Sequence, residues 1–188
     1  MLIGFLLGIG VVISVLCLTS CIGRQKPQDF AGKQPEFVME KFFSGKVKGW
    51  GAFFDRNGNL KTSFTLDVLG SFEGDVLTLK ELIQYSNGDQ DRREWKMRKL
   101  DAHRWEGLTA DVPGAAAGES YGNALRWNYF LNLKSGGSTY KVWFDDWMYL
   151  QPGNVLMNRA GASKWGFDVG HAVMFFMPET QLKIDLSS

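Results

Sequence analysis

Short runs of alternating apolar and polar residues, separated by closely spaced turn signals, constrain the fold of this chain more than any other feature. The turn signals are rich in Gly, Asn, Asp and Pro, and they recur at Arg56–Asn59, Glu73–Gly74, Ser86–Asp89, Ser135–Ser138 and Gln151–Asn154. Alternation places successive side chains on opposite faces of a strand, and tight turns join antiparallel neighbours. The pattern therefore predicts an antiparallel β-meander. No helical periodicity longer than two or three turns competes with it.

The clearest hairpin surrounds Gly136 and Gly137. With these glycines as a two-residue loop, the residues of one face pair as Leu133 with Tyr140, Leu131 with Val142, Tyr129 with Phe144, Trp127 with Asp146 and Leu125 with Met148. The opposite face carries Arg126, Asn128, Phe130 and Asn132 against Trp147, Asp145, Trp143 and Lys141. A slip by one residue would destroy this sorting, so the pattern fixes the register. Because Asp145 and Asp146 are consecutive strand residues, they point to opposite faces and cannot act together on one substrate atom.

Two further hairpins can be aligned in the same way. Taking Glu73–Gly74 as a two-residue loop places Leu66 opposite Glu81 and Asp67 opposite Lys80. Taking Ser86–Gly88 as a three-residue loop places Glu81 opposite Arg93, with Leu79 opposite Trp95 and Leu77 opposite Met97. Both registers gather apolar residues on one face, with Glu81 as the exception.

Many short antiparallel strands without helical partners form either a sandwich or a closed barrel. Consecutive hairpins favour an all-β, up-and-down barrel, and about eight to ten strands fit in the chain. We predict that residues 36–188 form this barrel. The dense glycines between Gly107 and Gly122 are typical of a strand bend or a close backbone contact.

Residues 1–20 have the features of a lipoprotein signal peptide. No charged residue precedes Arg24, and Leu18-Thr19-Ser20-Cys21 resembles the bacterial lipobox, a leucine and two small residues before the cysteine that receives the lipid. The segment lacks the usual Lys or Arg near its start, so an uncleaved membrane helix is the alternative. We predict acylation at Cys21 and attachment to a membrane on the periplasmic side.

The residues after the cysteine extend this prediction. Ile22 stands where lipoproteins kept at the inner membrane often carry Asp, which favours the outer membrane. Residues 21–35 are polar and contain Pro27 and Pro35, so we predict a flexible tether.

Composition excludes several classes of function. Lys and Arg total 21 and Asp and Glu total 20, giving a net charge of +1, which argues against a nucleic-acid partner. Cys17 and Cys21 are the two cysteines, and cleavage and acylation leave no free thiol for catalysis or metal binding. His103 and His171 have no companions at ligand spacing, so we predict no metal and no cofactor.

Charged residues on the predicted apolar face are the candidate site. A carboxylate at Asp146 must find donors or become protonated, and the Trp127 indole and Arg159 are candidate donors. A satisfied buried group that fixes the register is one interpretation. The other is that Glu81, Arg93, Asp146 and Arg159 converge in the interior and orient the head group of an amphiphile.

Four segments carry a family resemblance: FSGKVKGWGAFFDRNGNLKTSF, GNALRWNYFLNL, YKVWFDDWMYL and NRAGASKWGFDVG. They closely resemble the proteobacterial domain-of-unknown-function family 3833 over roughly residues 37–176. The resemblance implies a predicted lipoprotein with a lipocalin-like barrel. Because family members tend to be encoded near lipid-modifying enzymes, it also implies a fatty-acid or phospholipid role, but no catalytic residues. The family's recurring residues correspond here to Arg93, Trp95, Asn123, Trp127, Asp145, Asp146, Trp147, Asn158 and Arg159.

Three functions therefore compete. We expect a lipid-anchored barrel that binds a fatty acid or lipid intermediate, with Glu81, Arg93, Trp95, Trp127, Asp146, Asn158 and Arg159 as candidate ligand contacts. The first alternative is an enzyme or accessory factor in membrane fatty-acid or phospholipid modification that uses Glu81 or Asp146. The second is a structural partner in the cell envelope that docks through the outer aromatic residues Phe130, Trp143 and Trp147.

Overall fold

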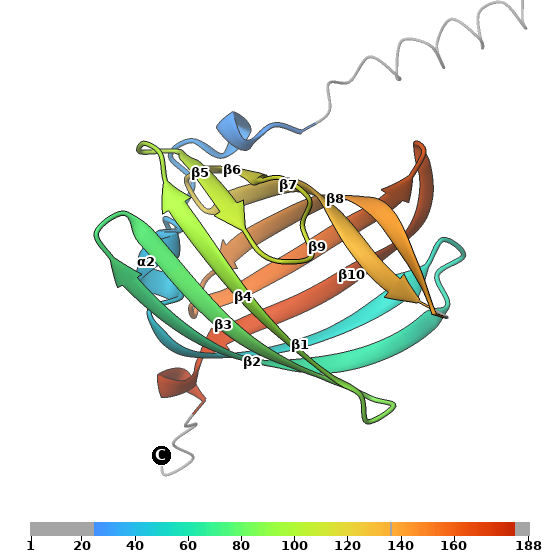
Figure 1. Ribbon diagram of the computed structural model, residues 1–188. Helices are drawn as coiled ribbons and strands as arrows, with labels where there is room; N and C mark the ends of the chain where they lie inside the picture. The colour runs from blue at the N-terminus through green and yellow to red at the C-terminus, as the bar shows by residue number, and fades with distance from the viewer. Residues whose placement is uncertain (1–24, 136, 183–188) are drawn as a thin grey trace, which may run out of the picture.

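The structure is a computed structural model that describes residues 25–135 and 137–182. Within these residues, ten antiparallel strands form one closed barrel, in which sequence neighbours pair and β1 closes the ring with β10 (Figure 1). The strands are β1 (Gly45–Asp55), β2 (Leu60–Glu73), β3 (Val76–Tyr85), β4 (Gln90–Lys99), β5 (Arg104–Leu108), β6 (Ala116–Tyr121), β7 (Ala124–Ser135), β8 (Ser138–Gln151), β9 (Val155–Lys164) and β10 (Phe167–Pro178). The predicted all-β, up-and-down barrel is confirmed.

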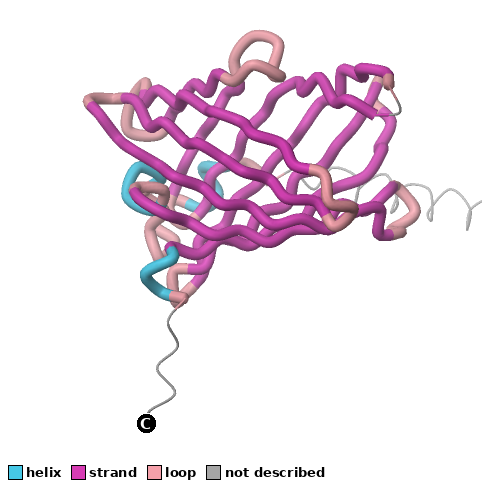
Figure 2. Tube along the Cα trace, turned by 60° about the horizontal axis from the view of Figure 1, so that its bottom comes forward, coloured by secondary structure: helices cyan, strands magenta, loops and turns pink. Residues whose placement is uncertain are grey.

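The same residues include three short helical segments: η1 (Pro27–Phe30), α2 (Met39–Phe42) and η2 (Glu179–Gln181). They lie toward one end of the barrel (Figure 2). None of the helices in the described part of the chain has the length and hydropathy needed to cross a bilayer.

Two of the registers predicted from the sequence are confirmed. In the β7–β8 hairpin, Trp127 lies opposite Asp146 and the other predicted pairs follow. In the β3–β4 hairpin, Glu81 lies opposite Arg93, again with its predicted neighbours. Strict alternation therefore places both candidate carboxyls, those of Glu81 and Asp146, on the inner face of the barrel.

The predicted register of the β2–β3 hairpin is wrong by two residues. The turn is Gly74–Asp75 and not Glu73–Gly74, and Gly74 adopts a φ of 62°, which glycine accepts readily. A shift of two residues keeps every side chain on its predicted face but changes its partner. Asp67 consequently forms its ion pair with Lys48 of β1, at 2.6 Å, and not with Lys80.

One end of the barrel, called here the closed end, is filled by apolar side chains. The segment before β1 contributes four buried residues: Phe37, Met39, Phe42 and Phe43. The Phe43 ring packs edge-on against Phe176, with centroids 6.0 Å apart. The Phe43 carbonyl occupies the space that a Cβ at residue 70 would need, so β2 requires Gly70 at this position. The helical segment thus acts as a plug.

The opposite end, called here the open end, is not filled in this way. Phe53, Phe64, Tyr85 and Met174 face the interior and pack against the core, yet each remains half-buried. A side chain in a filled core loses nearly all its exposure. These four side chains are therefore less tightly enclosed than the plug residues at the closed end.

The segment before the plug packs against the barrel wall, which corrects the prediction of a flexible tether for residues 25–35. Phe30 of η1 contacts Trp147 and Tyr149, with ring centroids 6.0 and 5.5 Å apart. The Gln25 amide donates a hydrogen bond to the Tyr149 hydroxyl at 2.7 Å. The predicted signal peptide, residues 1–20, and the lipidation site at Cys21 lie outside the described residues.

Candidate functional site

Asp146 is a buried carboxyl in the middle of β8. Its strand neighbours are Trp127 on β7 and Ala160 on β9. Its carboxylate accepts a hydrogen bond from the Asn158 amide and a longer one, 3.4 Å, from the Tyr129 hydroxyl. Asn158 is itself fully buried and also donates to the Trp147 carbonyl at 3.2 Å. The predicted need for donors is therefore met by Asn158 and Tyr129.

Burial raises the pKa of Asp146 to about 6. The hydrogen bonds from Asn158 and Tyr129 act in the opposite direction, and the nearby negative charge of Asp145 adds to the increase. Burial also raises the pKa of the Tyr129 hydroxyl well above its usual value, so this hydroxyl keeps its proton. Tyr129 is thus a permanent donor in the interior.

A second group of charges lies around Glu81 and Arg93. The Arg93 guanidinium donates from both Nε and Nη2 to the same oxygen of Asp111, at 3.1 and 2.7 Å. In the described part of the chain, Glu81 itself has no hydrogen-bond or ion-pair partner, although it lies close enough to Arg93 to feel its charge. The position of Glu81 opposite Arg93 was predicted from the sequence, whereas Asp111 was not predicted as a partner of Arg93.

Burial raises the pKa of Glu81 to about 7, with Arg93 opposing this change and the charges of Asp111 and Asp146 adding to it. For Arg93, burial lowers the pKa but the negative charges of Glu81 and Asp111 outweigh it, so the net direction is upward. Arg93 therefore stays charged, while Glu81 exchanges its proton near neutral pH.

Asp111 reaches the site because β5 and β6 are short. β4 pairs with β5 only from Lys96 onward, and β6 pairs with β7 only as far as Asn128. The loop 109–115 crosses this unpaired section, where the Asn132 backbone N–H donates to the Asp111 carbonyl at 2.8 Å. The loop thereby completes the wall and carries a carboxylate to Arg93.

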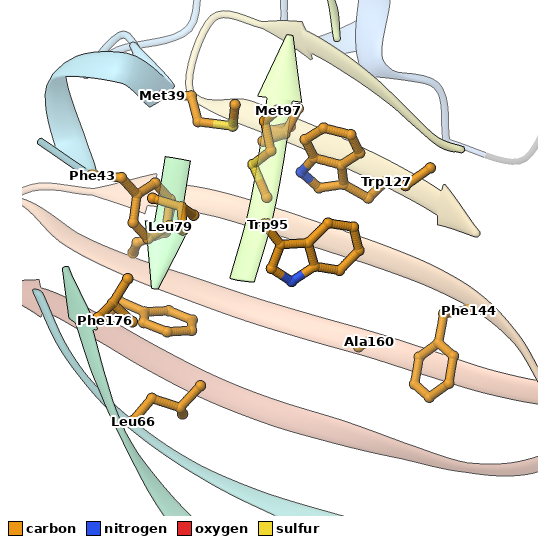
Figure 3. Close-up of a cluster of buried hydrophobic side chains, with 14 of the residues drawn as sticks. Met39, Phe43, Leu66, Leu79, Trp95, Met97, Trp127, Phe144, Ala160 and Phe176 are labelled. Carbon is orange, nitrogen blue, oxygen red and sulfur yellow. The ribbon is translucent and has the colours of Figure 1, made fainter. Parts of the chain in front are cut away.

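Four aromatic side chains, called here the aromatic layer, line the interior around this site: Trp95, Trp127, Tyr129 and Phe144. Tyr129 stacks on Phe144 with centroids 5.5 Å apart and meets Trp95 edge-on at 5.7 Å. Figure 3 shows the indoles of Trp95 and Trp127 side by side in the interior. A Cβ at Gly107 would lie 3.2 Å from the Trp127 ring and 3.3 Å from the Trp95 ring. The expected close backbone contact in this glycine-rich region is confirmed.

The structure thus gathers six polar side chains, called here the polar cluster: Glu81, Arg93, Asp111, Tyr129, Asp146 and Asn158. The ionisation of Glu81 responds to Arg93, Asp111 and Asp146, which shows that the two halves of the cluster interact. Glu81, Arg93, Asp146 and Asn158 were predicted. Tyr129 was placed on the correct face without a role, although its diagonal position relative to Asp146 was a usable signal.

Two predicted contacts are wrong. Arg159 lies on the outer face of β9 and is exposed, because residues 158 and 160 face inward. It therefore cannot donate to Asp146. The Trp127 indole N–H points elsewhere too, and it has no hydrogen-bond partner among the described residues.

The outer face near Asp146 has a structural role. Arg126 donates two hydrogen bonds to the Asp145 carboxylate, at 2.7 and 2.9 Å, across the outer face of the β7–β8 hairpin. Trp147 is only 8% exposed because Phe30 packs on it. A docking patch that includes Trp147 is therefore not available, although Phe130 remains exposed.

The polar cluster can exchange protons and form hydrogen bonds. Within residues 25–135 and 137–182, neither Glu81 nor Asp146 contacts a Ser, Thr, Cys or Lys side chain. The same residues contain no group of three or more His, Cys, Asp or Glu side chains arranged to hold a metal ion.

Fold and site together define a closed ten-strand antiparallel barrel with a polar cluster in a partly open interior. The chain belongs to the family described as protein of unknown function (DUF3833), which matches residues 15–178. A search of curated proteins found no significant match.

Proposed function

We propose that this protein is a binding barrel whose open half holds a small amphipathic molecule. The polar group of the ligand meets the polar cluster, and its apolar part lies against the inward-facing side chains near the open end. The observation that carries this proposal is the incomplete filling of the open half, where Phe53, Phe64 and Met174 face the interior without being buried. Ligand sites in small barrels have this combination of apolar walls and few polar groups.

The charges of the cluster restrict the ligand's polar group. Arg93 contributes one positive charge, and Asp111 already occupies it with two hydrogen bonds. With Glu81 and Asp146 ionised, one positive and three negative charges leave a net charge of −2, and with both protonated the net charge is zero. The cluster is never positive, so it favours a neutral or cationic group. Of the lipids expected from the sequence, a free fatty acid is the least suited at neutral pH.

Unused hydrogen-bonding capacity supports the same conclusion. The Trp127 indole N–H and the Asn158 side-chain carbonyl are buried without partners in the described structure. Buried polar groups are nearly always paired, so unpaired ones indicate a site that a polar group or water completes. The Asn158 carbonyl offers an acceptor next to Asp146, and the Trp127 indole N–H offers an unpaired donor elsewhere in the same interior.

Competition between ligands of equal chain length tests the proposal. A fluorescent amphiphile bound to the full chain is displaced by decanol, decylamine or decanoate at pH 8 and at pH 5. We expect decylamine and decanol to displace the probe at pH 8, and decanoate to improve at pH 5, because Glu81 and Asp146 gain protons below about pH 7 and 6. Tightest binding of decanoate at pH 8 would contradict the assignment of charge.

A matched pair of variants shows whether the ligand occupies the interior. Met174 faces the open half, whereas its neighbour Val173 pairs with Arg159 on the outer face. Met174→Trp fills the interior and should abolish probe binding, and Val173→Trp should leave it unchanged. Equal binding by both variants would place the probe outside the barrel.

The cellular location is part of the same proposal. We propose that Cys21 carries a lipid anchor and holds the barrel on the periplasmic side of the envelope, at the outer membrane. Support comes from the lipobox-like Leu18–Cys21 and from Ile22. Metabolic labelling with an alkyne palmitate should mark the wild-type chain and not Cys21→Ser. Persistent labelling of the variant would rule out this anchor.

A further inference from the structure

Three adjacent turns at the open end expose large apolar side chains. Trp165 and Phe167 of the β9–β10 turn are 87% and 74% exposed, and Leu60 after the β1–β2 turn is 59% exposed. Tyr140 of the β7–β8 hairpin is exposed as well. Because β8 pairs with β9 and β10 pairs with β1, these turns are neighbours around the barrel. We call residues 55–61, 137–141 and 164–169 the open rim.

The open rim is also basic. Its cationic residues are Arg56, Lys61, Lys141 and Lys164, against the two acidic residues Asp55 and Asp168. Both acids act within their own turns, since Asp55 accepts the backbone N–H groups of Asn57 and Asn59 and Asp168 accepts that of Gly170. The Lys164 ammonium lies over two rim aromatics, 4.3 Å from the Tyr140 ring and 4.6 Å from the Trp165 ring. Cations are thus interleaved with aromatic side chains.

Another turn at this end has a different character. The β3–β4 turn, residues 86–92, contains two aspartates and one arginine and exposes no large apolar side chain. The apolar and basic character therefore belongs to one side of the open end. Exposed apolar and basic side chains are therefore not a common property of all turns at this end.

We propose that the open rim docks on the surface of a bilayer that contains anionic lipid. Trp and Tyr side chains favour the interface between headgroups and acyl chains, and anionic headgroups attract Lys and Arg. The exposed residues sit on separate protruding turns, a shape that suits insertion between headgroups. A protein partner would instead require a continuous complementary patch. Docking faces the mouth of the barrel toward the lipid, and it does not depend on whether the interior holds a ligand.

Quenching by brominated lipid tests the contact at a single residue. The full chain is added to vesicles of phosphatidylcholine and phosphatidylglycerol with brominated acyl chains, and tryptophan emission is recorded. The chain has seven tryptophans, so Trp165 is isolated by subtracting the signal of Trp165→Phe. Trp50→Phe is the matched control, because Trp50 is exposed on the wall of β1 away from the rim. This readout reports insertion of the rim even where the N-terminal segment also attaches the chain to the vesicle.

We expect the brominated chains to quench the Trp165 contribution, and the quenched fraction to be retained in Trp50→Phe. The quenched fraction of the Trp165 emission should decrease on vesicles of phosphatidylcholine alone, and also in the double variant Lys61→Gln with Lys141→Gln. It should not decrease in Lys96→Gln, because Lys96 lies on the exposed outer face of β4. Unquenched Trp165 would overturn the proposal. Equal quenching with and without anionic lipid would overturn it too, as would a dimer that shields Trp165 from the lipid.

Discussion

Glu81 links the interior of the barrel to pH. Its pKa is about 7 in the folded protein, against an ordinary value of 4.5, because burial outweighs the attraction of Arg93. A carboxyl with a raised pKa contributes stability that is fully present below about pH 4.5 and is lost as the pH rises through about 7. Glu81 therefore favours folding in acid and opposes it above neutrality.

We predict that Glu81→Gln flattens the dependence of stability on pH between about 4.5 and 7. At pH 8 the variant should exceed the wild type in free energy of unfolding by about 1–3 kcal/mol, since the amide never ionises. Urea unfolding of both proteins at several pH values measures this difference. Asp146 titrates in both proteins and cancels in the comparison, so parallel curves would show that Glu81 ionises freely.

Asp146 provides a second prediction at this scale, which separates its hydrogen bonds from its charge. Asp146→Asn keeps an oxygen for the Asn158 and Tyr129 donors and never ionises, so at pH 7 it should raise the free energy of unfolding by about 1–3 kcal/mol. Asp146→Leu strands both donors in the interior and should cost about 1–3 kcal/mol. Adding Asn158→Leu should restore part of the loss. Denaturation at pH 7 distinguishes these cases, and an equal change for the amide and the leucine would show that the hydrogen bonds contribute little.

Alternation along strands made part of the polar cluster predictable from the sequence. Asp146, Glu81 and Arg93 lie in strands whose partners are fixed by clear hairpins, so their faces were correct. Arg159 was misplaced because no register had been derived for β9. Asp111 was missed since it lies in the loop 109–115, where no periodicity indicates direction.

At the scale of elements, hairpin registers are predictable where the turn leaves one choice. In the β7–β8 hairpin Ser135 pairs with Ser138, and a one-residue shift would reverse both faces. The sequence allowed the β2–β3 turn at Glu73–Gly74 or at Gly74–Asp75. The two resulting strand registers differ by two residues, so both place the same apolar side chains on the inner face. The structure distinguishes these two registers through the positive φ of Gly74 and the strand pairing in which Glu73 lies opposite Val76.

Close packing of β6 against an indole gives a prediction for this element. A Cβ at Gly118 would lie 2.8 Å from the Trp127 ring, which is buried and cannot move freely. We predict that Gly118→Ala lowers the free energy of unfolding by about 1–3 kcal/mol through overpacking. Gly161→Ala on β9 is the control, because its Cβ would make an ordinary contact of 3.6 Å with the Asp145 carbonyl. Thermal unfolding measures both, and equal changes would exclude steric conflict at Gly118.

At the scale of the whole molecule, the two ends of the barrel differ in the chain segments that cover them. The plug before β1 fills the closed end, whereas Phe53, Phe64 and Met174 toward the open end remain half-buried and the turns there form an apolar, basic rim. Alternation predicts one interior but not which end is filled, because the plug is a short helical segment outside the hairpin pattern.

The two ends should therefore respond differently to the same truncation. Phe43 is 4% exposed in the plug, so Phe43→Ala should lower the free energy of unfolding by about 3–5 kcal/mol. Phe53 is half-buried at the open end, so Phe53→Ala should cost only about 1–2 kcal/mol. Hydrogen exchange locates the effect: Phe43→Ala should speed exchange where β2, β3 and β10 meet the plug, and leave the β9–β10 turn unchanged. Equal costs for the two variants would show that both ends are packed alike, and the proposed ligand space would then not exist.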